Sequence, residues 1–447
     1  MTSSLPCVTL KRNRQSRSFR DGNQLVFTKA IDSLSSKNIQ VGQLVQVAVP
    51  REQSSSLEVL GYGVYNPHSL YRIRFLCHKY VQPSLFKQIQ NKEADPEEAL
   101  RVVLRHHLRS ALQLRQGGLI DWNSTDTYRL CHGEGDSLSG LAIDVIGSQH
   151  AVIMSSALWC QVHRDMIQSE VQATLGSGVQ LVWRTTPSRL EQDGLSEATK
   201  EGQDTTNRFT LLLNGAQESS SEKDKVVYYR ENGVKFAAYP YEGGQKTSVY
   251  CDQRENRMHV ASLAKGKTVL DLCCYHGGFS LTALVQGNAK AATAVDSSAD
   301  AVKAAADNAE LNRVELECVQ ADITSFLQDM HGQRSWDIVV LDPPKLAPSV
   351  SALDKARRKY HALNRDAIKV IADTGGYLMT CTCSAAMTQE EGGQAFLNMV
   401  QGAALAAHRR VTLLRVSGAA SCHTQSPISW PAGNYLTAAL FYVHPTE

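Results

Sequence analysis

The stretch TVLDLCCYHGGFSLTALVQ, residues 268–286, sets the interpretation of the whole 447-residue chain. It opens with a short apolar run that contains β-branched residues, which predicts a β-strand over residues 268–272. Gly277 and Gly278 then predict a tight turn, and residues 280–286 have the composition of a helix. A strand, a glycine turn and a helix in this order begin an α/β unit.

The same order of elements repeats farther along the chain. Apolar runs predict strands over residues 291–295, 317–320 and 336–341, and an alanine-rich segment without a helix breaker predicts a helix over residues 299–311. Strands that alternate with helices indicate a parallel sheet with right-handed crossovers. We therefore expect an α/β fold.

Four aspartates, Asp271, Asp296, Asp322 and Asp342, fall at or just beyond the ends of the predicted strands. The carboxyl ends of parallel strands share one edge of a sheet, and ligands bind along that edge. Asp296 is placed to accept hydrogen bonds from both hydroxyls of a ribose, and Asp322 is placed to receive an adenine amino group. The sequence therefore predicts a nucleoside site at this edge.

The glycine turn narrows the class of ligand. It lacks the three-glycine dinucleotide fingerprint, and no segment matches a P-loop. A nucleoside without a phosphate fits better than NAD, and S-adenosylmethionine is such a ligand. Two glycines by themselves are also compatible with a plain structural turn.

Composition excludes several classes of protein. A hydrophobic content of 43% supports packed cores and argues against a disordered chain, while the net charge of +2 says little about partners. The eleven cysteines include no CxxC pair, so we predict neither a disulfide framework nor a metal site, and a reducing compartment suits them. No apolar run reaches the length of a membrane span.

The N-terminal end is basic. A cluster of basic residues precedes the first acidic residue, Asp21, and consists of Lys11, Arg12, Arg14, Arg17 and Arg20. Such a cluster can contact a polyanion, and it can equally be a solvated terminus. The serine- and arginine-rich start also resembles a transit peptide, so a chloroplast or mitochondrial location is the alternative to the cytoplasm.

Changes in composition divide the chain into three parts. Residues 1–80 predict a small β domain, residues 81–235 an α/β middle region with a polar insertion at about 191–224, and residues 236–447 the main α/β domain. The polar insertion is interrupted by an apolar run at residues 209–213.

Several predicted elements bear on the site. Residues 69–75 alternate polar and apolar side chains like a half-buried strand, and the outward Arg72 and Arg74 could contact phosphate or only solvent. Residues 160–175 and 388–407 predict helices. Residues 411–416 and 435–443 predict an antiparallel pair of strands at one edge of the last sheet.

Two further motifs follow predicted strands, Asp342-Pro343-Pro344 and Thr382-Cys383-Ser384. The doubled proline fixes the backbone and makes a rigid ledge. A cysteine beside a methyl donor suggests that the Cys383 thiolate attacks carbon 6 of cytosine. This attack makes carbon 5 nucleophilic, so that it can accept the methyl group. Asp342 can hydrogen-bond ring nitrogen 3. A buried structural cysteine is the alternative interpretation of Cys383.

These motifs together resemble the bacterial large-subunit ribosomal RNA 5-methylcytosine methyltransferases of the RlmI-like family. The matching segments, which span nearly the whole chain, are Arg129 with Glu134–Leu141, Tyr250–Arg254, Val269–Asp271 with Tyr275–Phe279, Asp342–Leu346 and Thr382–Met387.

The resemblance implies an N-terminal PUA-like β-barrel that binds RNA, a small α/β middle domain and a class I, Rossmann-like methyltransferase domain. It implies S-adenosylmethionine as cofactor, large-subunit ribosomal RNA as partner, no membrane, and allows a homodimer. The resemblance assigns the role of nucleophile to Cys383. Asp342 is the second expected catalytic residue, and Cys381 has no assigned role. The expected cofactor residues are Gln253, Arg254, Tyr275, Gly277, Gly278, Asp296, Asp322 and Asp342.

Two departures from the family pattern leave alternatives open. His276 replaces a threonine of the cofactor turn, and the polar insertion is unusual. One alternative is methylation of another RNA atom, such as a guanine exocyclic amine, which needs no thiol. The other is an RNA-binding assembly factor without catalytic activity.

Overall fold

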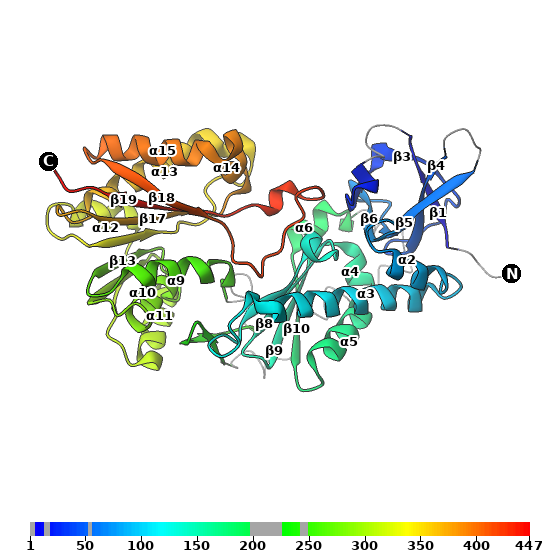
Figure 1. Cartoon of the computed structure of the whole chain (residues 1–447), viewed down its shortest axis with the longest axis horizontal. Coiled ribbons are helices and arrows are strands. Elements are labelled where there is room, and N and C mark those ends of the chain that lie inside the picture. Colours follow the sequence, from blue (N-terminus) through cyan, green and yellow to red (C-terminus); the bar gives the residue numbers. More distant parts are fainter. Residues whose placement is uncertain (1–4, 13–17, 52–55, 197–225, 242–248) are drawn as a thin grey trace.

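The computed structural model describes residues 5–12, 18–51, 56–196, 226–241 and 249–447 and consists of three parts (Figure 1). Arg14, Arg17, the apolar run at 209–213 and most of the predicted polar insertion lie outside the described residues. No helix in the described part of the chain is long and apolar enough to cross a membrane.

The N-terminal part is a six-stranded mixed sheet with the order β2-β6-β5-β4-β1-β3. Alternation of apolar and polar residues puts Val47, Ile73 and Phe75 at full burial inside it. The strands are β1 (Cys7–Leu10), β2 (Leu25–Phe27), β3 (Ile31–Leu34), β4 (Leu44–Pro50), β5 (Leu57–Tyr65) and β6 (Tyr71–His78).

The middle part is a four-stranded sheet, β10-β9-β8-β7, with helices against it. The helix predicted over residues 160–175 is two helices, because His163 leaves the helical conformation and its Nε2 lies 2.8 Å from the Gly42 carbonyl. The elements are α2 (Pro83–Gln90), α3 (Pro96–Leu114), β7 (Tyr128–His132), β8 (Leu141–Ile146), β9 (His150–Ser155), α4 (Leu158–Val162), α5 (Arg164–Leu175), β10 (Gln180–Thr185) and α6 (Pro187–Gln192).

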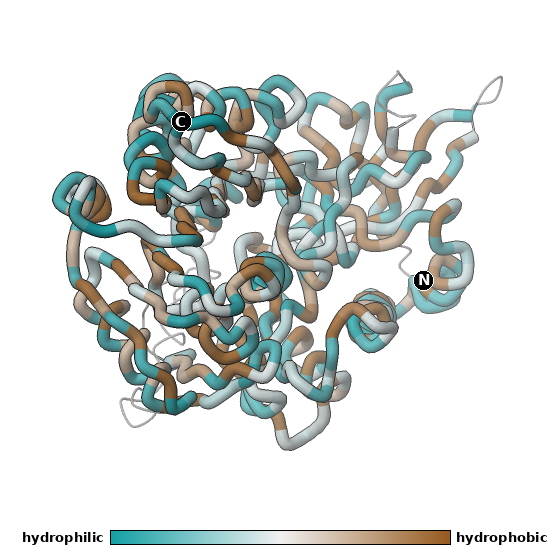
Figure 2. Tube along the Cα trace, turned by 60° about the vertical axis from the view of Figure 1, so that its left-hand side comes forward, coloured by the Kyte–Doolittle hydropathy of each residue, from teal (hydrophilic) through white to brown (hydrophobic). Residues whose placement is uncertain are grey.

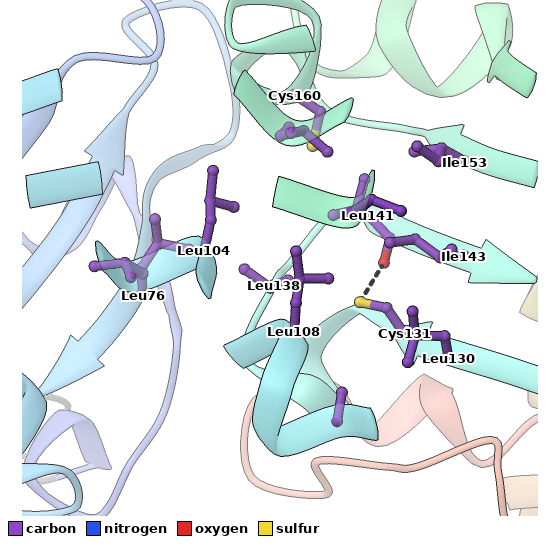
Figure 3. Close-up of a cluster of buried hydrophobic side chains, with 14 of the residues drawn as sticks. Leu76, Leu104, Leu108, Leu130, Cys131, Leu138, Leu141, Ile143, Ile153 and Cys160 are labelled. Carbon is purple, nitrogen blue, oxygen red and sulfur yellow. Dashed lines mark hydrogen bonds between the residues drawn. The ribbon is translucent and has the colours of Figure 1, made fainter. Parts of the chain in front are cut away.

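One hydrophobic core joins these two parts. Leu76 of β6 belongs to the same buried cluster as Leu104 and Leu108 of α3 and as Ile143 and Ile153 of the middle sheet (Figure 3). The boundary predicted at residue 80 therefore separates two sheets that share this core, although the N-terminal sheet also has a core of its own. We infer that the N-terminal and middle parts are rigidly coupled.

A buried carboxylate reinforces this junction. Asp193 accepts hydrogen bonds from Ser69 Oγ (2.6 Å), from Arg74 Nη2 (2.8 Å) and from the Leu158 amide (2.8 Å). Arg74 is consequently buried, and the prediction that it points outward to phosphate is wrong. The first residues of the predicted polar insertion, including Asp193, are thus part of the folded scaffold.

A two-stranded hairpin leads into the C-terminal part. It consists of β11 (Val227–Glu231) and β12 (Val234–Ala238), so the domain boundary predicted between residues 235 and 236 falls inside β12. Asn308 of the C-terminal part accepts a hydrogen bond from the Ala237 amide at 2.9 Å. The hairpin is therefore tied to the domain that follows it.

The C-terminal part is a seven-stranded sheet with the order β15-β14-β13-β16-β17-β19-β18. The first five strands of this order are parallel and the last two are antiparallel, which confirms the predicted α/β fold and the antiparallel edge pair. The strands are β13 (Thr268–Leu272), β14 (Ala291–Asp296), β15 (Glu317–Gln320), β16 (Ile338–Leu341), β17 (Gly376–Thr382), β18 (Val411–Ser417) and β19 (Thr437–Val443).

Helices cover both faces of this sheet, and apolar segments run through its middle while polar segments lie outside (Figures 1 and 2). The helix predicted over residues 388–407 is interrupted, because Glu391 and Gly392 have positive φ. The helices are α9 (Arg254–Leu263), α10 (Gly278–Val285), α11 (Ala299–Asn312), α12 (Ile323–Met330), α13 (Leu353–Lys369), α14 (Ala385–Gln389) and α15 (Gln394–Ala406).

The chain between β18 and β19 leaves the sheet and reaches the centre of the molecule near α6 (Figure 1). There, Arg115 Nη2 donates to the Cys422 carbonyl (2.7 Å), Thr424 Oγ1 donates to Asp136 (2.7 Å), and the Gln24 amide donates to Ser429 Oγ (3.0 Å). We call residues 418–436 the bridging loop, because it contacts all three parts.

Candidate functional site

The glycine turn after β13 has the strained backbone of a ligand site. Cys273 and Tyr275 have φ values of 60° and 50°, in the left-handed region that side chains disfavour, and Gly277 has φ 81°. Asp271, within β13, accepts a hydrogen bond from the Ser280 amide (2.9 Å) and so holds the start of α10. Burial raises the pKa of Asp271 to about 6.

Asp296 ends β14 beside this turn, as the sequence predicts. Its carboxylate accepts hydrogen bonds from the amides of Tyr275 and Ser298, both at 3.0 Å. The carboxylate is half-buried, so its outer face stays accessible. An acid held in this way next to a glycine turn is the arrangement that binds a ribose.

Arg257, for which the sequence predicted no role, lies at the glycine turn, and the predicted cofactor residue Arg254 does not. Arg254, predicted to meet the cofactor carboxylate, is buried with its Nη1 3.4 Å from the Thr127 carbonyl and its guanidinium against the Cys422 thiol. Arg257 lies at the turn instead, where a Cβ on Gly278 would come within 2.5 Å of its Nε. Glu231 holds it there through a 2.6 Å ion pair.

The guanidinium of Arg257 indicates which kind of ligand fits at the glycine turn. Within the described residues its Nε is buried and has no hydrogen-bond partner. A buried donor of this kind is costly unless a ligand satisfies it, and a carboxylate is the natural acceptor. The residues at the turn therefore suit a nucleoside that carries an amino-acid tail, and sequence reasoning missed Arg257 because only Glu231 fixes its direction.

Asp322, another predicted cofactor residue, caps α12. Its Oδ1 accepts hydrogen bonds from the amides of Thr324 (2.9 Å) and Ser325 (3.3 Å), and the second of these bonds contributes most to the lowered pKa of its carboxyl. The side chain is exposed. It follows β15 on the same sheet edge as Asp296, so the expected contact with an adenine amino group stays a prediction.

His276, the departure from the family pattern, points away from this edge. Its Nε2 lies 3.2 Å from the Tyr229 hydroxyl, and its ring packs against Phe236 of β12. Burial lowers the pKa of His276 to about 3, so the ring is neutral. We infer that it fills the space between the hairpin and the glycine turn.

A chain of hydrogen bonds orients Asp342 at the end of β16. Gln253 Nε2 donates to Asp342 Oδ2 (3.0 Å), and Gln253 Oε1 accepts from Asn256 Nδ2 (2.7 Å). Ser417 Oγ donates to Asn256 Oδ1 (2.7 Å), which fixes the orientation of both amides. The predicted cofactor residue Gln253 thus contacts the predicted catalytic acid.

The environment of Asp342 favours its protonated form. Burial raises the pKa of Asp342 to about 7, and the nearby charge of Asp252 adds to the rise, while the Gln253 hydrogen bond opposes it. A carboxyl group with a pKa near neutrality can both give and take a proton.

Cys381 and Cys383 differ in burial and in position relative to β17. Cys381 lies within β17 and is fully buried, and desolvation raises the pKa of its thiol well above the ordinary value. Cys383 is the first residue after β17, is half-buried, and its Sγ lies 3.9 Å from the Pro343 carbonyl. The structure therefore brings Cys383, and not Cys381, to the ledge that follows Asp342.

A cleft with a volume of about 620 Å³ opens in front of Cys383. All three parts of the chain line it, and its walls include Tyr71, Arg189, Lys345 and Trp430. Tyr71 and Trp430 are in edge-to-face contact, with ring centroids 6.0 Å apart. A cleft of this size and composition can hold a nucleotide.

We expect Asp296→Ala to weaken binding of S-adenosylmethionine by roughly 1.5–3 kcal/mol, the scale of hydrogen bonds to a charged group. Asp296→Asn keeps an acceptor for the Tyr275 amide and separates loss of charge from loss of the turn. Asp300→Ala, at an exposed position in the first turn of α11, is the matched control. Calorimetry that finds equal affinities would remove Asp296 from the site.

Comparison with known proteins agrees with this geometry. Residues 212–398 match the model of an S-adenosylmethionine-dependent methyltransferase family, and residues 8–78 match a PUA-like domain. The expected fold, a PUA-like domain followed by a methyltransferase domain, is thereby confirmed, as is the expected cofactor.

Similar chains are matched over their whole length. Ribosomal RNA large subunit methyltransferase I of Tolumonas auensis is 30% identical over 437 residues, covering 96% of this chain and 97% of the relative. That of Photobacterium profundum is 31% identical over 451 residues, covering 99% and 100%. A methyltransferase crystallised with SAH has a TM-score of 0.70 at 18% identity, covering 98% of this chain and 99% of its own, and supports the fold.

Proposed function

The chain belongs to the ribosomal RNA large subunit methyltransferase I family, and from that premise we propose that it methylates carbon 5 of a cytosine in large-subunit ribosomal RNA. The observation that carries the proposal is the placement of Cys383 and Asp342. They follow neighbouring parallel strands, since Leu341 of β16 pairs with Thr380 of β17. Cys383 faces the cleft, and the pKa of Asp342 is raised to about 7.

The two side chains have complementary tasks. The Cys383 thiolate adds to carbon 6 of the cytosine, and Asp342 gives its proton to nitrogen 3, so carbon 5 gains electron density. S-adenosylmethionine supplies the methyl group. The carbon 5 proton then passes to solvent, the bond between carbon 6 and sulfur breaks, and nitrogen 3 returns its proton to Asp342. These steps restore the aromatic ring, the thiolate and the Asp342 carboxyl group.

Positioning residues keep Asp342 available for this task. Gln253 donates to the oxygen of Asp342 that does not carry the proton, and Asn256 prevents the Gln253 amide from turning over. The Pro343-Pro344 ledge has no backbone donors that could compete for the base. Cytosine is thus bound by side chains whose hydrogen-bonding directions are fixed.

The cleft suits RNA. Arg189 and Lys345 are exposed cations that can contact phosphate, and Tyr71 and Trp430 offer ring surfaces for unstacked bases. In the basic cluster at the N-terminus, Arg20 forms a 2.7 Å ion pair with Glu58, whereas Lys11 and Arg12 are exposed and do not line the cleft. We therefore assign the main RNA contact to the cleft between the three parts.

The test is methyl transfer by the purified protein from labelled S-adenosylmethionine to large-subunit ribosomal RNA, with small-subunit RNA as control. Nucleoside mass spectrometry should find the label in 5-methylcytidine of the large-subunit RNA. Label in a methylated guanosine would contradict the assigned base atom, and absence of label in folded, cofactor-binding protein would favour an assembly factor.

A further inference from the structure

Two thiols and one imidazole converge at the junction between the bridging loop and the start of α9. Cys251 lies in the short 3-10 helix η4 (Cys251–Gln253), and Cys422 and His423 lie in the bridging loop. Their donor atoms all lie within 4.8 Å of one another, and Cys422 Sγ is 3.4 Å from His423 Nδ1. All three side chains are buried.

We propose that Cys251, Cys422 and His423 bind one zinc ion. Tetrahedral zinc has bonds of about 2.3 Å to sulfur and about 2.0 Å to nitrogen, which places neighbouring donors roughly 3.5–3.8 Å apart. The separation of Cys422 and His423 already matches this, and the widest separation in the cluster requires only a small contraction. Soft thiolate donors with an imidazole select zinc over magnesium or calcium.

Hydrogen bonds that do not involve these three side chains hold the bridging loop against η4 and the start of α9. The Ala420 amide donates to the Asp252 carbonyl (2.7 Å), and the Ser421 amide donates to Glu255 (2.9 Å). The His423 amide donates to the Ala420 carbonyl (2.8 Å), which forms the turn that presents Cys422 and His423 side by side. The ligands are therefore preorganised, which lowers the entropic cost of binding.

The surrounding charges are compatible with a dication held by two thiolates. Arg129, the cation beside the cluster on β7, is already neutralised by its ion pair with Asp144. Arg254, the other nearby cation, lies with its guanidinium against the Cys422 thiol, where it can hydrogen-bond to a zinc-bound sulfur. Two thiolates offset the charge of the metal, and the hydrogen bond that the Cys251 thiol donates to Asp144 Oδ1 (3.9 Å) is replaced by the bond to zinc.

One side of the cluster is open. Cys251 and His423 line a cavity of about 250 Å³, together with His132 and Tyr435. This cavity has room for a water molecule as fourth ligand, which is the arrangement of zinc sites with three protein ligands. Bound zinc would fasten the bridging loop to η4, whose last residue, Gln253, orients Asp342.

This proposal is independent of the base that the enzyme methylates, because it concerns the junction of the parts and not the RNA. It also departs from the prediction of no metal site, which rested on cysteine spacing. Cys251 and Cys422 are far apart in the sequence, so spacing cannot show that they meet.

The test is titration of the full-length, reduced, metal-free protein with Co²⁺. Tetrahedral cobalt complexes with thiolate ligands have absorption bands in the visible range and a sulfur-to-cobalt charge-transfer band. We expect one equivalent to bind and zinc to displace it. Cys251→Ser, Cys422→Ser and His423→Ala should each abolish the charge-transfer band or shift it strongly. Cys7→Ser, which removes a half-buried thiol of β1, is the matched control and should leave the titration unchanged.

A measurement on the unmodified protein covers the case in which a variant fails to fold. Zinc should protect Cys251 and Cys422 from alkylation, as mapped by peptide mass spectrometry, while the half-buried Cys7 should react equally with and without zinc. The proposal is wrong if the reduced protein takes up no cobalt, or if Cys251→Ser binds it as the unmodified protein does. If the reduced protein takes up no cobalt, and exposure to air forms a disulfide between Cys251 and Cys422, the two cysteines are a redox pair instead.

Discussion

Cys383→Ala should lose methyl transfer to RNA by at least about 10³-fold, the scale on which removal of a catalytic nucleophile is felt, while the protein stays folded and binds S-adenosylmethionine. The physical reason is that carbon 5 of cytosine is a poor nucleophile until a thiolate adds at carbon 6. Cys383 is half-buried at the end of β17, so alanine removes a thiol from the cleft wall and leaves no closed cavity.

The covalent step has its own measurement. The unmodified enzyme should form an adduct with RNA that contains 5-fluorocytosine, because fluorine at carbon 5 blocks the elimination that frees the enzyme. The adduct should appear as a shifted band on a denaturing gel and be absent from Cys383→Ala.

Cys381→Ala is the matched control for this experiment. Cys381 lies two positions earlier, inside β17, and is fully buried, so the variant should retain most of the activity and the adduct. Methyl transfer by Cys383→Ala at the rate of the unmodified enzyme would refute the covalent mechanism. Direct transfer to an exocyclic amine would then be the better account.

Asp342→Asn should lower the rate of methyl transfer by about 10²–10⁴-fold, the usual contribution of a general acid or base. Asparagine keeps an oxygen that can accept from Gln253, so the chain from Gln253 to Asn256 and Ser417 should remain. What it loses is the proton for nitrogen 3 of cytosine. The affinity for S-adenosylmethionine, measured by calorimetry, should show whether Asp342 also contacts the cofactor.

The same substitution should stabilise the protein at neutral and alkaline pH. In the unfolded chain Asp342 ionises near its ordinary value of 3.8, whereas the folded protein raises its pKa to about 7. Between these values the folded state holds more protons than the unfolded state, so the free energy of unfolding falls as pH rises. The upper limit is about 1.4 kcal/mol per pH unit, and the partial exposure of Asp342 to solvent reduces it.

We therefore expect the thermal midpoint of Asp342→Asn to exceed that of the unmodified protein by an amount that grows from pH 4 to pH 7 and then levels off. Asp300→Asn, at an exposed site, should show no such growth. A constant difference between Asp342→Asn and the unmodified protein across this range would mean that the carboxyl group ionises normally in the fold.

The sequence by itself determined the order of the elements and the edge at which the site forms. Strands over residues 268–272 and 317–320 have the predicted bounds, because hydrophobic periodicity is a local property of the chain. Once the strands are parallel, their carboxyl ends share one edge. This edge therefore includes the residues that end or follow these strands, namely Asp296, Asp342 and Cys383, and their gathering there does not depend on how the side chains pack.

Only the tertiary structure decided which polar side chains are buried and what they contact. Arg74 looks like a solvent-facing residue of β6 until Asp193 covers it, and Arg257 reaches the glycine turn only because Glu231 pairs with it. These partners come from distant segments, and a buried charge follows its partner. Local periodicity identifies the apolar face of an element but carries no information about which distant segment will cover its polar face.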